Sequence, residues 1–306
     1  MVTTVLVVFF VLPPHRGEAF GLRAQRTRWP KGEPVAFTIN MANAPAAYSE
    51  AQMRQMVQDA LKVWRQMESV GLSFRVGDII NDPEKTSAQP DGQNVIFWPA
   101  PGAARQGVLV VGRAFVFAAD CDILVQPRAP FTLPEVKSII MHEIGHCLGL
   151  GHSVAPSVMT MVSHLPVLSN DDLVGLAVLY PNAEAPLERA TATLTGRVVR
   201  GDAPLIGASL RVIDRATNKT VLTGFSGLVD RQRRSDAAGR FELPGIPPGR
   251  YQFRVEPPET RILEDPDGFG APSGASATTF RARVVDVPDL SAGQTYDVGT
   301  VGVVSQ

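Results

Sequence analysis

Three histidines and one glutamate in the middle of the chain have the spacing of a metal site. His142 and His146 are four residues apart, so on a helix their imidazoles lie on one face, one turn from each other. Together with His152 they offer three nitrogen ligands, which suit zinc and leave a fourth position for a water molecule. Glu143 is placed to accept a proton from that metal-activated water, as a general base, and to pass it to a leaving amine. The pattern predicts zinc-dependent hydrolysis of peptide bonds.

The third histidine requires the helix to end. His152 lies six residues after His146, and in a continuous helix it would face away from the metal. Gly149 lies between them, and glycine adopts the left-handed conformation that ends many helices. We therefore expect the chain to turn at Gly149 and to return His152 to the metal.

The sequence also predicts the helices and strands that must position these residues. Capping residues and apolar periodicity predict a long helix over residues 49–69, the site helix over 133–150 and a last helix over 169–180. Around the first two helices, short strands are predicted over residues 29–40, 72–76, 94–98, 107–117 and 121–126.

A change of pattern follows the last helix. Residues 181–191 combine Pro, Ala and charge without periodicity, which is typical of a linker. Beyond them only short strands separated by Gly and Pro turns are predicted, which indicates an all-β sandwich. These strands cover residues 193–200, 209–215, 219–225, 240–243, 251–256, 279–285 and 296–303.

The site motif is similar to that of a known family. HEIGHCLGLGH (142–152) resembles the HExxHxxGxxH signature of the metzincin metallopeptidases, and Ser153 matches the matrixin subgroup. SVM (157–159) falls where metzincins place a methionine turn, and LSNDDLVGLAVLYP (168–181) resembles the matrixin closing helix. The resemblance covers about residues 28–181. It implies an α+β fold, in which a metzincin catalytic domain with a twisted, mostly parallel sheet and long helices is followed by the all-β sandwich.

The resemblance also implies roles for particular residues. Met159 would support the three histidines from below without being a ligand. An aspartate at the start of the closing helix binds the mature N-terminal ammonium in matrixins, which points to Asp171 or Asp172; alternatively these are ordinary first-turn carboxylates that favour the helix dipole. The second, structural zinc of animal matrixins lacks ligands, because residues 69–133 contain no histidine. One catalytic zinc ion is therefore expected. Calcium stays open, since acidic residues are present without a recognisable calcium-loop spacing.

The second resemblance concerns the C-terminal part. SDAAGRFELPGIPPGRYQFRVEPP (235–258) resembles the carboxypeptidase regulatory-like, transthyretin-like β-sandwich domains, and no residue in it carries evident chemistry. The expected organisation is a signal peptide over 1–19, a matrixin-like zinc metallopeptidase domain over 20–182, a linker over 183–192 and the β-sandwich domain over 193–306.

Composition and the first residues bear on location and partners. The net charge of −1 gives no electrostatic reason to expect nucleic acid or an anionic membrane as a partner. Residues 2–12 form an apolar run that is too short to span a bilayer but suits a signal peptide, with cleavage after Ala19. No Lys or Arg precedes that run, and a buried first strand is the alternative. We expect a secreted or cell-surface monomer without a membrane span in its mature form, acting on protein or peptide.

Three alternatives are left open by the residues themselves. Cys121 and Cys147 are compatible with one disulfide or with two buried thiols. A gluzincin would take a downstream glutamate as third ligand, but the next one is Glu184, in the predicted linker. A catalytically silent, zinc-containing surface-binding protein would have a closed fourth position or no general base, whereas Glu143 is present.

Overall fold

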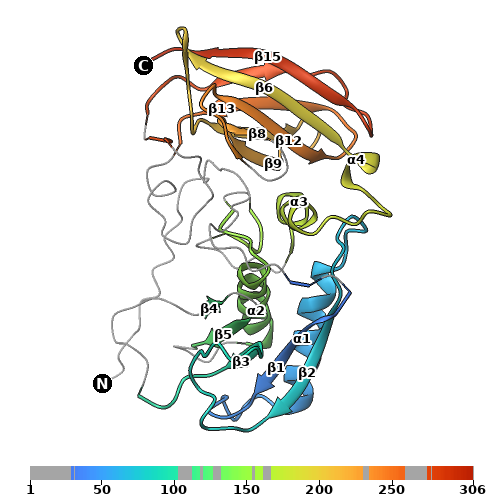
Figure 1. Ribbon diagram of the computed structural model, residues 1–306, viewed down its shortest axis with the longest axis vertical. Helices are drawn as coiled ribbons and strands as arrows, with labels where there is room; N and C mark the ends of the chain where they lie inside the picture. Colours follow the sequence, from blue (N-terminus) through green and yellow to red (C-terminus); the bar gives the residue numbers. More distant parts are fainter. Residues whose placement is uncertain are drawn as a thin grey trace, which may run out of the picture.

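The computed structural model describes residues 29–30, 32–102, 112–117, 120–126, 132–153, 156–160, 167–229, 234–258, 274–276 and 278–305. The predicted signal peptide over residues 1–19 lies outside them. Figure 1 shows two units stacked along the long axis, one with a sheet and helices α1 and α2, the other built of strands, with helix α3 between them. Within the described ranges, no helix is both long enough and apolar enough to cross a membrane. The structure combines helices with several sheets, which agrees in part with the expected α+β layout.

The N-terminal unit is built on a five-stranded sheet with the strand order β2-β1-β3-β5-β4. Four strands run parallel, and β4 pairs with β5 in the antiparallel direction at the edge of the sheet. The strands are β1 (Val35–Asn40), β2 (Phe74–Ile80), β3 (Val95–Phe97), β4 (Gly112–Val116) and β5 (Cys121–Val125). The mostly parallel sheet agrees with the prediction. Residues 107–111, predicted to begin the fourth strand, lie outside the described residues.

Helix α1 (Glu50–Trp64) begins with a capping box between Ser49 and Gln52 and packs against α2 and β2. It ends five residues before the predicted end at Ser69. The chain after it is used in a tertiary pairing, because Gly71 N donates to Tyr180 O at 2.7 Å and Asn182 N donates to Ser69 O at 2.9 Å. The buried stripe of α1 consists of Met53, Met56, Val57, Ala60, Leu61 and Trp64, as the periodicity predicts.

Helix α2 (Leu133–Cys147) carries the predicted site residues. Both the amide and the hydroxyl of Thr132 donate to the carboxylate of Glu135, at 2.7 and 2.8 Å, which completes the start of the helix. Its middle is held against α1, since Trp64 Nε1 donates to Met141 O at 3.2 Å in the buried interior. Nearly every residue of its second half is buried, so the site helix runs through the core.

Helix α3 (Asn170–Leu179) and the short helix α4 (Leu187–Ala190) connect the two units. Ser169 and Asp172 form a capping box at the start of α3. The segment predicted as a linker thus contains one helical turn, whose residue Leu187 is buried.

The C-terminal unit, residues 192–305, contains two sheets. One has the order β11-β10-β12-β6-β15, with β7 beside β6, and the other has the order β14-β13-β8-β9. Phe241 and Phe253, one from each sheet, are stacked in the core with their ring centroids 5.3 Å apart. The strands are β6 (Ala192–Arg200), β7 (Ala203–Pro204), β8 (Ser209–Asp214), β9 (Thr220–Phe225), β10 (Leu228–Val229), β11 (Arg234–Ser235), β12 (Arg240–Ile246), β13 (Tyr251–Glu256), β14 (Arg283–Asp286) and β15 (Thr295–Val303).

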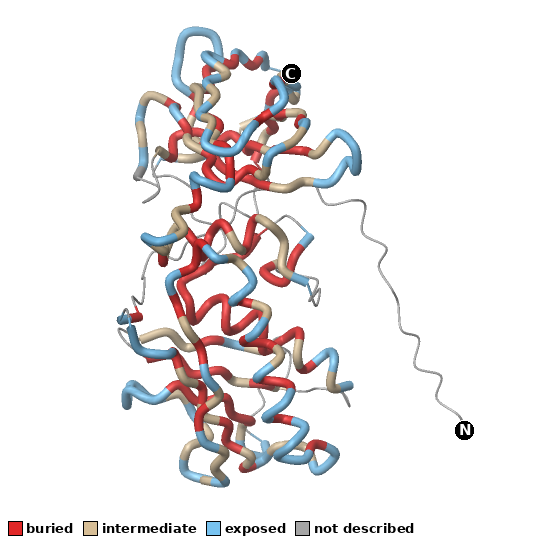
Figure 2. Tube along the Cα trace, turned by 90° about the vertical axis from the view of Figure 1, so that its right-hand side faces the viewer, coloured by how far each residue is buried: buried red, intermediate tan, exposed pale blue. Residues whose placement is uncertain are grey.

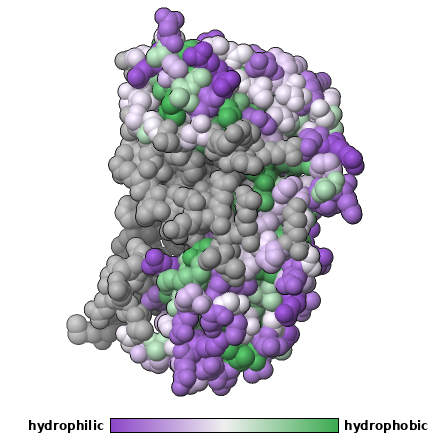
Figure 3. Space-filling view, in the orientation of Figure 1, coloured by the Kyte–Doolittle hydropathy of each residue, from purple (hydrophilic) through white to green (hydrophobic). Residues whose placement is uncertain are grey.

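The two units share one buried core. Figure 2 shows buried segments in both units and in the region between them. The hydrophobic cluster contains Val174 of α3 together with Ile246 of β12. The described surface is largely hydrophilic in the view of Figure 3. The large hydrophobic side chains exposed among the described residues are Val167, Val284 and Val304.

Candidate metal centre

The last two turns of α2 present His142, Glu143 and His146. All three side chains are buried, with exposed fractions of 4, 4 and 5%. Each group is therefore held in an environment of low polarity, where a polar side chain must find a partner within the protein or in a ligand.

The helix ends at Cys147, three residues before the predicted end at Leu150, and the chain turns at Gly149 as predicted. Gly149 has φ +96° and lies just past the last helical residues, where Gly149 N donates to His146 O and Leu150 N donates to Gly145 O, both at 3.0 Å. This pair of bonds is the Schellman motif, in which a left-handed residue reverses the chain after a helix. The turn at Gly149 carries the chain round to His152, as predicted.

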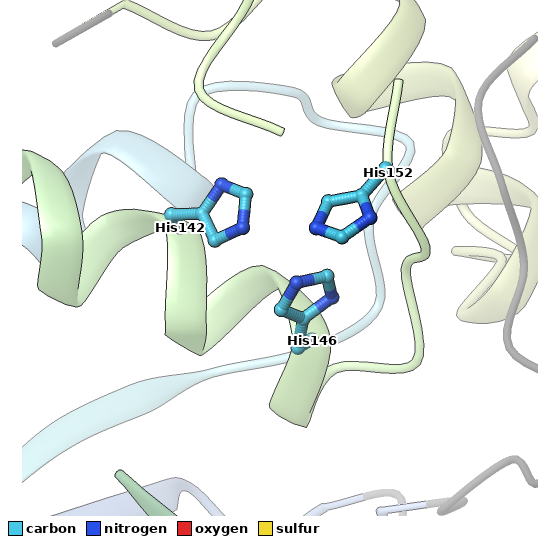
Figure 4. Close-up of side chains that lie close together, drawn as sticks. All are labelled: His142, His146 and His152. Atoms are coloured by element: carbon cyan, nitrogen blue, oxygen red, sulfur yellow. The ribbon is translucent and has the colours of Figure 1, made fainter. Parts of the chain in front are cut away.

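The three histidines converge on one point, as Figure 4 shows. Their ligand nitrogens all lie within 4.8 Å of one another, and the ring centroids are 4.6 to 5.3 Å apart. Zinc bound to imidazole stands at about 2.0 to 2.1 Å from each nitrogen, so one ion can reach all three with small side-chain movements. The cluster of His142, His146 and His152 could therefore hold a metal ion.

Backbone carbonyl groups select the tautomer of two of these rings. The Nδ1 atom of His142 is 2.7 Å from Val158 O, and Nδ1 of His146 is 2.9 Å from Leu150 O. A carbonyl oxygen only accepts, so each Nδ1 must carry the proton and donate it. The lone pair is then on Nε2 of each ring, and this is the arrangement that ordinarily orients histidine ligands of a metal.

Met159 lies directly under the site helix, against Gly145. The methionine is 1% exposed, and a Cβ atom added at Gly145 would lie 2.2 Å from its Sδ atom and 3.0 Å from the ring of Trp64. Gly145 therefore lets Met159 approach the helix between the two helical histidines. The role of Gly145 was not predicted from the sequence. The signal for it was a glycine inside a helix, which costs about 1 kcal/mol relative to alanine.

The edge strand β4 approaches Glu143 through a second glycine. A Cβ atom at Gly112 would lie 2.7 Å from Glu143 Oε1 and 2.5 Å from Ile139 Cγ2. Any side chain at this position would displace the carboxylate. Gly112 was not singled out from the sequence, because its contact with Glu143 spans 31 residues.

The two cysteines form a disulfide, which settles the alternative between a bridge and two thiols. Cys121, the first residue of β5, is bonded to Cys147, the last residue of α2, with their Cα atoms 5.5 Å apart. Trp29 Nε1 also donates to Cys147 O at 3.0 Å. The end of α2, one residue after His146, is therefore attached covalently to the central sheet.

The two aspartates of α3 are both buried and hydrogen-bonded. Asp171, 0% exposed, accepts from Ser153 and from Thr223, whereas Asp172 accepts from Ser157 Oγ at 3.0 Å and from Ser169 N at 2.8 Å. Burial is the largest cause that raises the pKa of Asp172, and together with the neighbouring charge of Asp171 it brings this pKa to about 7 against the hydrogen bonds, which lower it. The predicted partner of one of these carboxylates, an N-terminal ammonium, lies outside the described residues.

A model of one known family matches this part of the chain. The matrixin family model, Peptidase_M10, matches residues 115–181, about a fifth of the 306 residues. Over this region the chain resembles the matrixins. The matched region runs from the end of β4 through α2, the three histidines and Met159 to the end of α3, and it supports a metallopeptidase at the level of the family. No curated protein matches the chain.

Solved structures are similar only to parts of the molecule. The major pilin subunit of Bacillus cereus is 20% identical over 37% of this chain and 30% of its own, with a TM-score of 0.24. A 9R-lipoxygenase from Cyanothece is 21% identical over 39% of this chain and 17% of its own (TM-score 0.24), and the 5-hydroxyisourate hydrolase of Klebsiella pneumoniae is 13% identical over 37% and 87% (TM-score 0.23). The chain thus spans less than a third of the first two proteins, and TM-scores this low assign neither fold nor function.

Outside the matrixin-like site, the acidic residues do not assemble a comparable centre. In the described part of the chain, the three histidines are the group of His, Cys, Asp or Glu side chains that lies close enough to share an ion. Asp122 instead accepts hydrogen bonds from Gln89 N and Val95 N, and burial raises its pKa to about 6. These bonds tie a loop to the sheet, and they give no support to a calcium site.

Proposed function

We propose that the chain is a secreted, zinc-dependent endopeptidase of the matrixin type, with a metzincin fold in its N-terminal unit. The observation that carries the proposal is the convergence of three buried imidazoles beside a buried glutamate, with two of the rings held in the tautomer that places the lone pair on Nε2. The partial match to the matrixin model supports the same assignment. The disulfide and the apolar N-terminal run support export, because disulfides persist in oxidising compartments.

In this proposal, His142, His146 and His152 hold the zinc ion, and Met159 supports them from below. The bound ion would polarise the scissile carbonyl group and make a water molecule acidic enough to react near neutral pH. Glu143 takes a proton from that water molecule while the oxygen of the water forms a bond to the carbonyl carbon. The glutamate then gives the proton to the amine nitrogen as the carbon–nitrogen bond breaks.

The position of β4 suits an extended peptide substrate. Among the described strands β4 is the end strand of its sheet, and its first residue, Gly112, lies against Glu143. A strand edge offers backbone N–H and C=O groups to a peptide that pairs with it as a further strand. Such pairing would bring a substrate backbone to the general base whatever its side chains.

The test is proteolysis of an unfolded, casein-like substrate by the purified mature chain. Glu143→Gln removes the base while keeping the shape of the side chain, and Glu50→Gln on α1 serves as the matched control. We expect the wild type and the control to cleave, and Glu143→Gln to keep about one zinc per chain with a rate about 10²- to 10⁴-fold lower. Cleavage that survives in Glu143→Gln contradicts the proposal.

The second candidate is a zinc-containing surface-binding protein without catalysis. Its basis is the C-terminal unit, whose described strands form two packed sheets of the kind that can serve as a binding module. A zinc-loaded wild type that remains inert on unfolded substrate, including after removal of the residues preceding Trp29, would support this candidate over the endopeptidase.

A further inference from the structure

The C-terminal unit is joined to the metal-binding unit by polar contacts of α3. Asn170 Nδ2 donates to Val221 O of β9 at 3.1 Å and to Gly245 O of β12 at 3.0 Å. One amide thus bridges the two sheets of the C-terminal unit. Gly245 has φ +88°, and a Cβ atom there would lie 2.4 Å from Val174 of α3, so the two units are in close contact.

Next to this bridge, Asp171 connects the C-terminal unit to the metal site. Its Oδ1 atom accepts from Thr223 N at 2.9 Å and from Thr223 Oγ1 at 3.0 Å, and its Oδ2 atom accepts from Ser153 Oγ at 2.8 Å. All three side chains are at most 1% exposed. Hydrogen bonds to a buried carboxylate are strong and short, so the three residues form one fixed unit.

Thr223 is suited to this contact by its place in the sheet. β9 is the end strand of its four-stranded sheet, beside β8. The amide of Thr223 donates to Asp171. On the outer edge of an end strand this N–H has no neighbouring strand among the described residues to pair with, and the carboxylate supplies its acceptor.

Ser153 transmits this contact to the third histidine. It follows His152 directly, and its own amide donates to Met159 O at 2.8 Å. His142 and His146 are fixed by the helix that carries them, but His152 lies beyond the end of α2. The placement of His152 therefore depends on the contacts of the chain next to it, and Ser153 is fixed on one side by Met159 and on the other by Asp171.

We propose that the C-terminal unit is a structural part of the metal centre, and that Thr223, Asp171 and Ser153 are positioning residues that hold His152 in place for the ion. This inference rests on the proposed zinc site, although it does not rest on the catalytic role of Glu143. A purely structural role for the same buried contacts would lower stability without changing how the folded protein binds metal.

The experiment measures the zinc dissociation constant of the full chain by competition with a chelator, together with the visible spectrum of the cobalt-substituted protein. Thr223→Val removes the hydroxyl and keeps the shape, Thr223→Ser keeps the hydroxyl, and Ser153→Ala removes the contact on the metal side. Asn170→Ala is the matched control, because it loses two hydrogen bonds to the same unit without touching Asp171. Stability is measured in parallel by urea unfolding of the zinc-free proteins.

We expect Thr223→Val and Ser153→Ala to raise the zinc dissociation constant about 3- to 30-fold, toward the range found for residues that orient metal ligands, and to alter the cobalt spectrum. Thr223→Ser should stay within about twofold of wild type, as should Asn170→Ala despite its loss of stability. The double variant Thr223→Val with Ser153→Ala should bind zinc hardly less tightly than Ser153→Ala alone, because both act through Asp171.

Unchanged zinc affinity and cobalt spectrum in both Thr223→Val and Ser153→Ala would overturn the inference and leave the proposed function standing. A wild type that does not bind zinc at all would overturn the proposed function, and this inference with it.

Discussion

The metal centre has two halves that are built differently. His142, Glu143 and His146 come from successive turns of α2, here called the helix half. His152 and Met159 come from irregular chain after the helix, here called the loop half. The helix half is positioned by local backbone hydrogen bonds, whereas the loop half is held by side-chain contacts with α3 and, through Asp171, with β9.

This difference has a physical consequence. The spacing of the helical residues follows from helix geometry, so the two helical histidines adopt nearly the same relation in any context that keeps α2 folded. The position of His152 follows from contacts between distant segments, such as Ser153 with Asp171, 18 residues apart, and Asp171 with Thr223, 52 residues apart. We expect damage to the helix half to lower the stability of the unit, and damage to the loop half to weaken metal binding in a folded protein.

The largest effect is expected at Gly145, where the two halves touch. In Gly145→Ala the new Cβ atom would lie 2.2 Å from Met159 Sδ. Overpacking of a buried site costs about 1 to 3 kcal/mol and occasionally more, and the clash with Trp64 as well leads us to expect a loss of about 3 to 4 kcal/mol in the free energy of unfolding.

Urea unfolding measures this effect, and a double-mutant cycle with Met159→Ala tests its cause. Removal of the thioether makes room for the new methyl group, so the double variant should lose less stability than the sum of the two single variants. Additive losses would mean that Met159 and Gly145 do not contact each other as described.

The disulfide is expected to make the next largest contribution to the stability of the helix half. Cys121 and Cys147 are 26 residues apart in the sequence, and the entropy of closing such a loop in the unfolded chain corresponds to about 3.5 kcal/mol. We expect the double variant Cys121→Ala with Cys147→Ala to lose about 3 kcal/mol in urea unfolding without zinc. At saturating zinc its cleavage rate should stay near that of wild type, because the ligands remain on a folded helix. A loss below about 1 kcal/mol would show that the bridge is dispensable for stability.

The same division explains what could be predicted from the sequence. The helix half was predictable because its signals are local: the spacing of His142 and His146, the capping pair Thr132 and Glu135, and the turn glycine Gly149 all lie within 20 residues. Where tertiary pairing overrides local pattern, the prediction failed. β2 continues to Ile80 beyond its predicted end because it pairs with β1, and α1 ends early because Gly71 bonds to Tyr180.

Contacts across the fold were not predictable from one sequence. The pairing of the cysteines stayed open because sequence does not give the distance between their Cα atoms. Gly112 resembles any glycine of a strand until β4 is placed beside Glu143. Similarly, Asp171 was assigned either to an N-terminal ammonium or to the helix dipole. The structure instead places Ser153 and Thr223 against it, and Thr223 lies 52 residues away in the other unit.

A smaller effect, on rate alone, is expected at Gly112. In Gly112→Ala the added methyl group must displace Ile139 or the carboxylate of Glu143. We expect kcat to fall about tenfold, which corresponds to about 1.4 kcal/mol of transition-state stabilisation, with zinc affinity unchanged. Gly302→Ala is the matched control, since Gly302 also lies in a strand and a Cβ atom there would meet nothing within 4 Å. Equal rates for the two variants would show that Gly112 does not set the position of the base.

The pH dependence of stability distinguishes the loop half. Burial raises the pKa of Asp172 from its usual 3.8 to about 7, so in the folded protein its carboxyl group stays protonated at a pH where the unfolded chain is already ionised. The folded state then binds more protons than the unfolded state, and the contribution of Asp172 to stability falls as pH rises from about 4 to about 7, with no further change above that range. Asp172→Asn removes this contribution and keeps a polar group next to Ser157 and Ser169.

Urea unfolding at pH 5 and pH 8, in the presence of a chelator, measures this dependence. Because wild type and variant differ only at residue 172, the difference between the two proteins isolates the carboxyl group of Asp172. Relative to wild type, we expect Asp172→Asn to be more stable at pH 8 than at pH 5 by about 1 to 3 kcal/mol. Asp214→Asn is the control, since hydrogen bonds from Thr217 lower the pKa of Asp214 and its contribution changes only below about pH 4. If the stability of Asp172→Asn relative to wild type is the same at pH 5 and pH 8, then Asp172 is ionised at both. Its hydrogen bonds would then stabilise the carboxylate more than burial destabilises it.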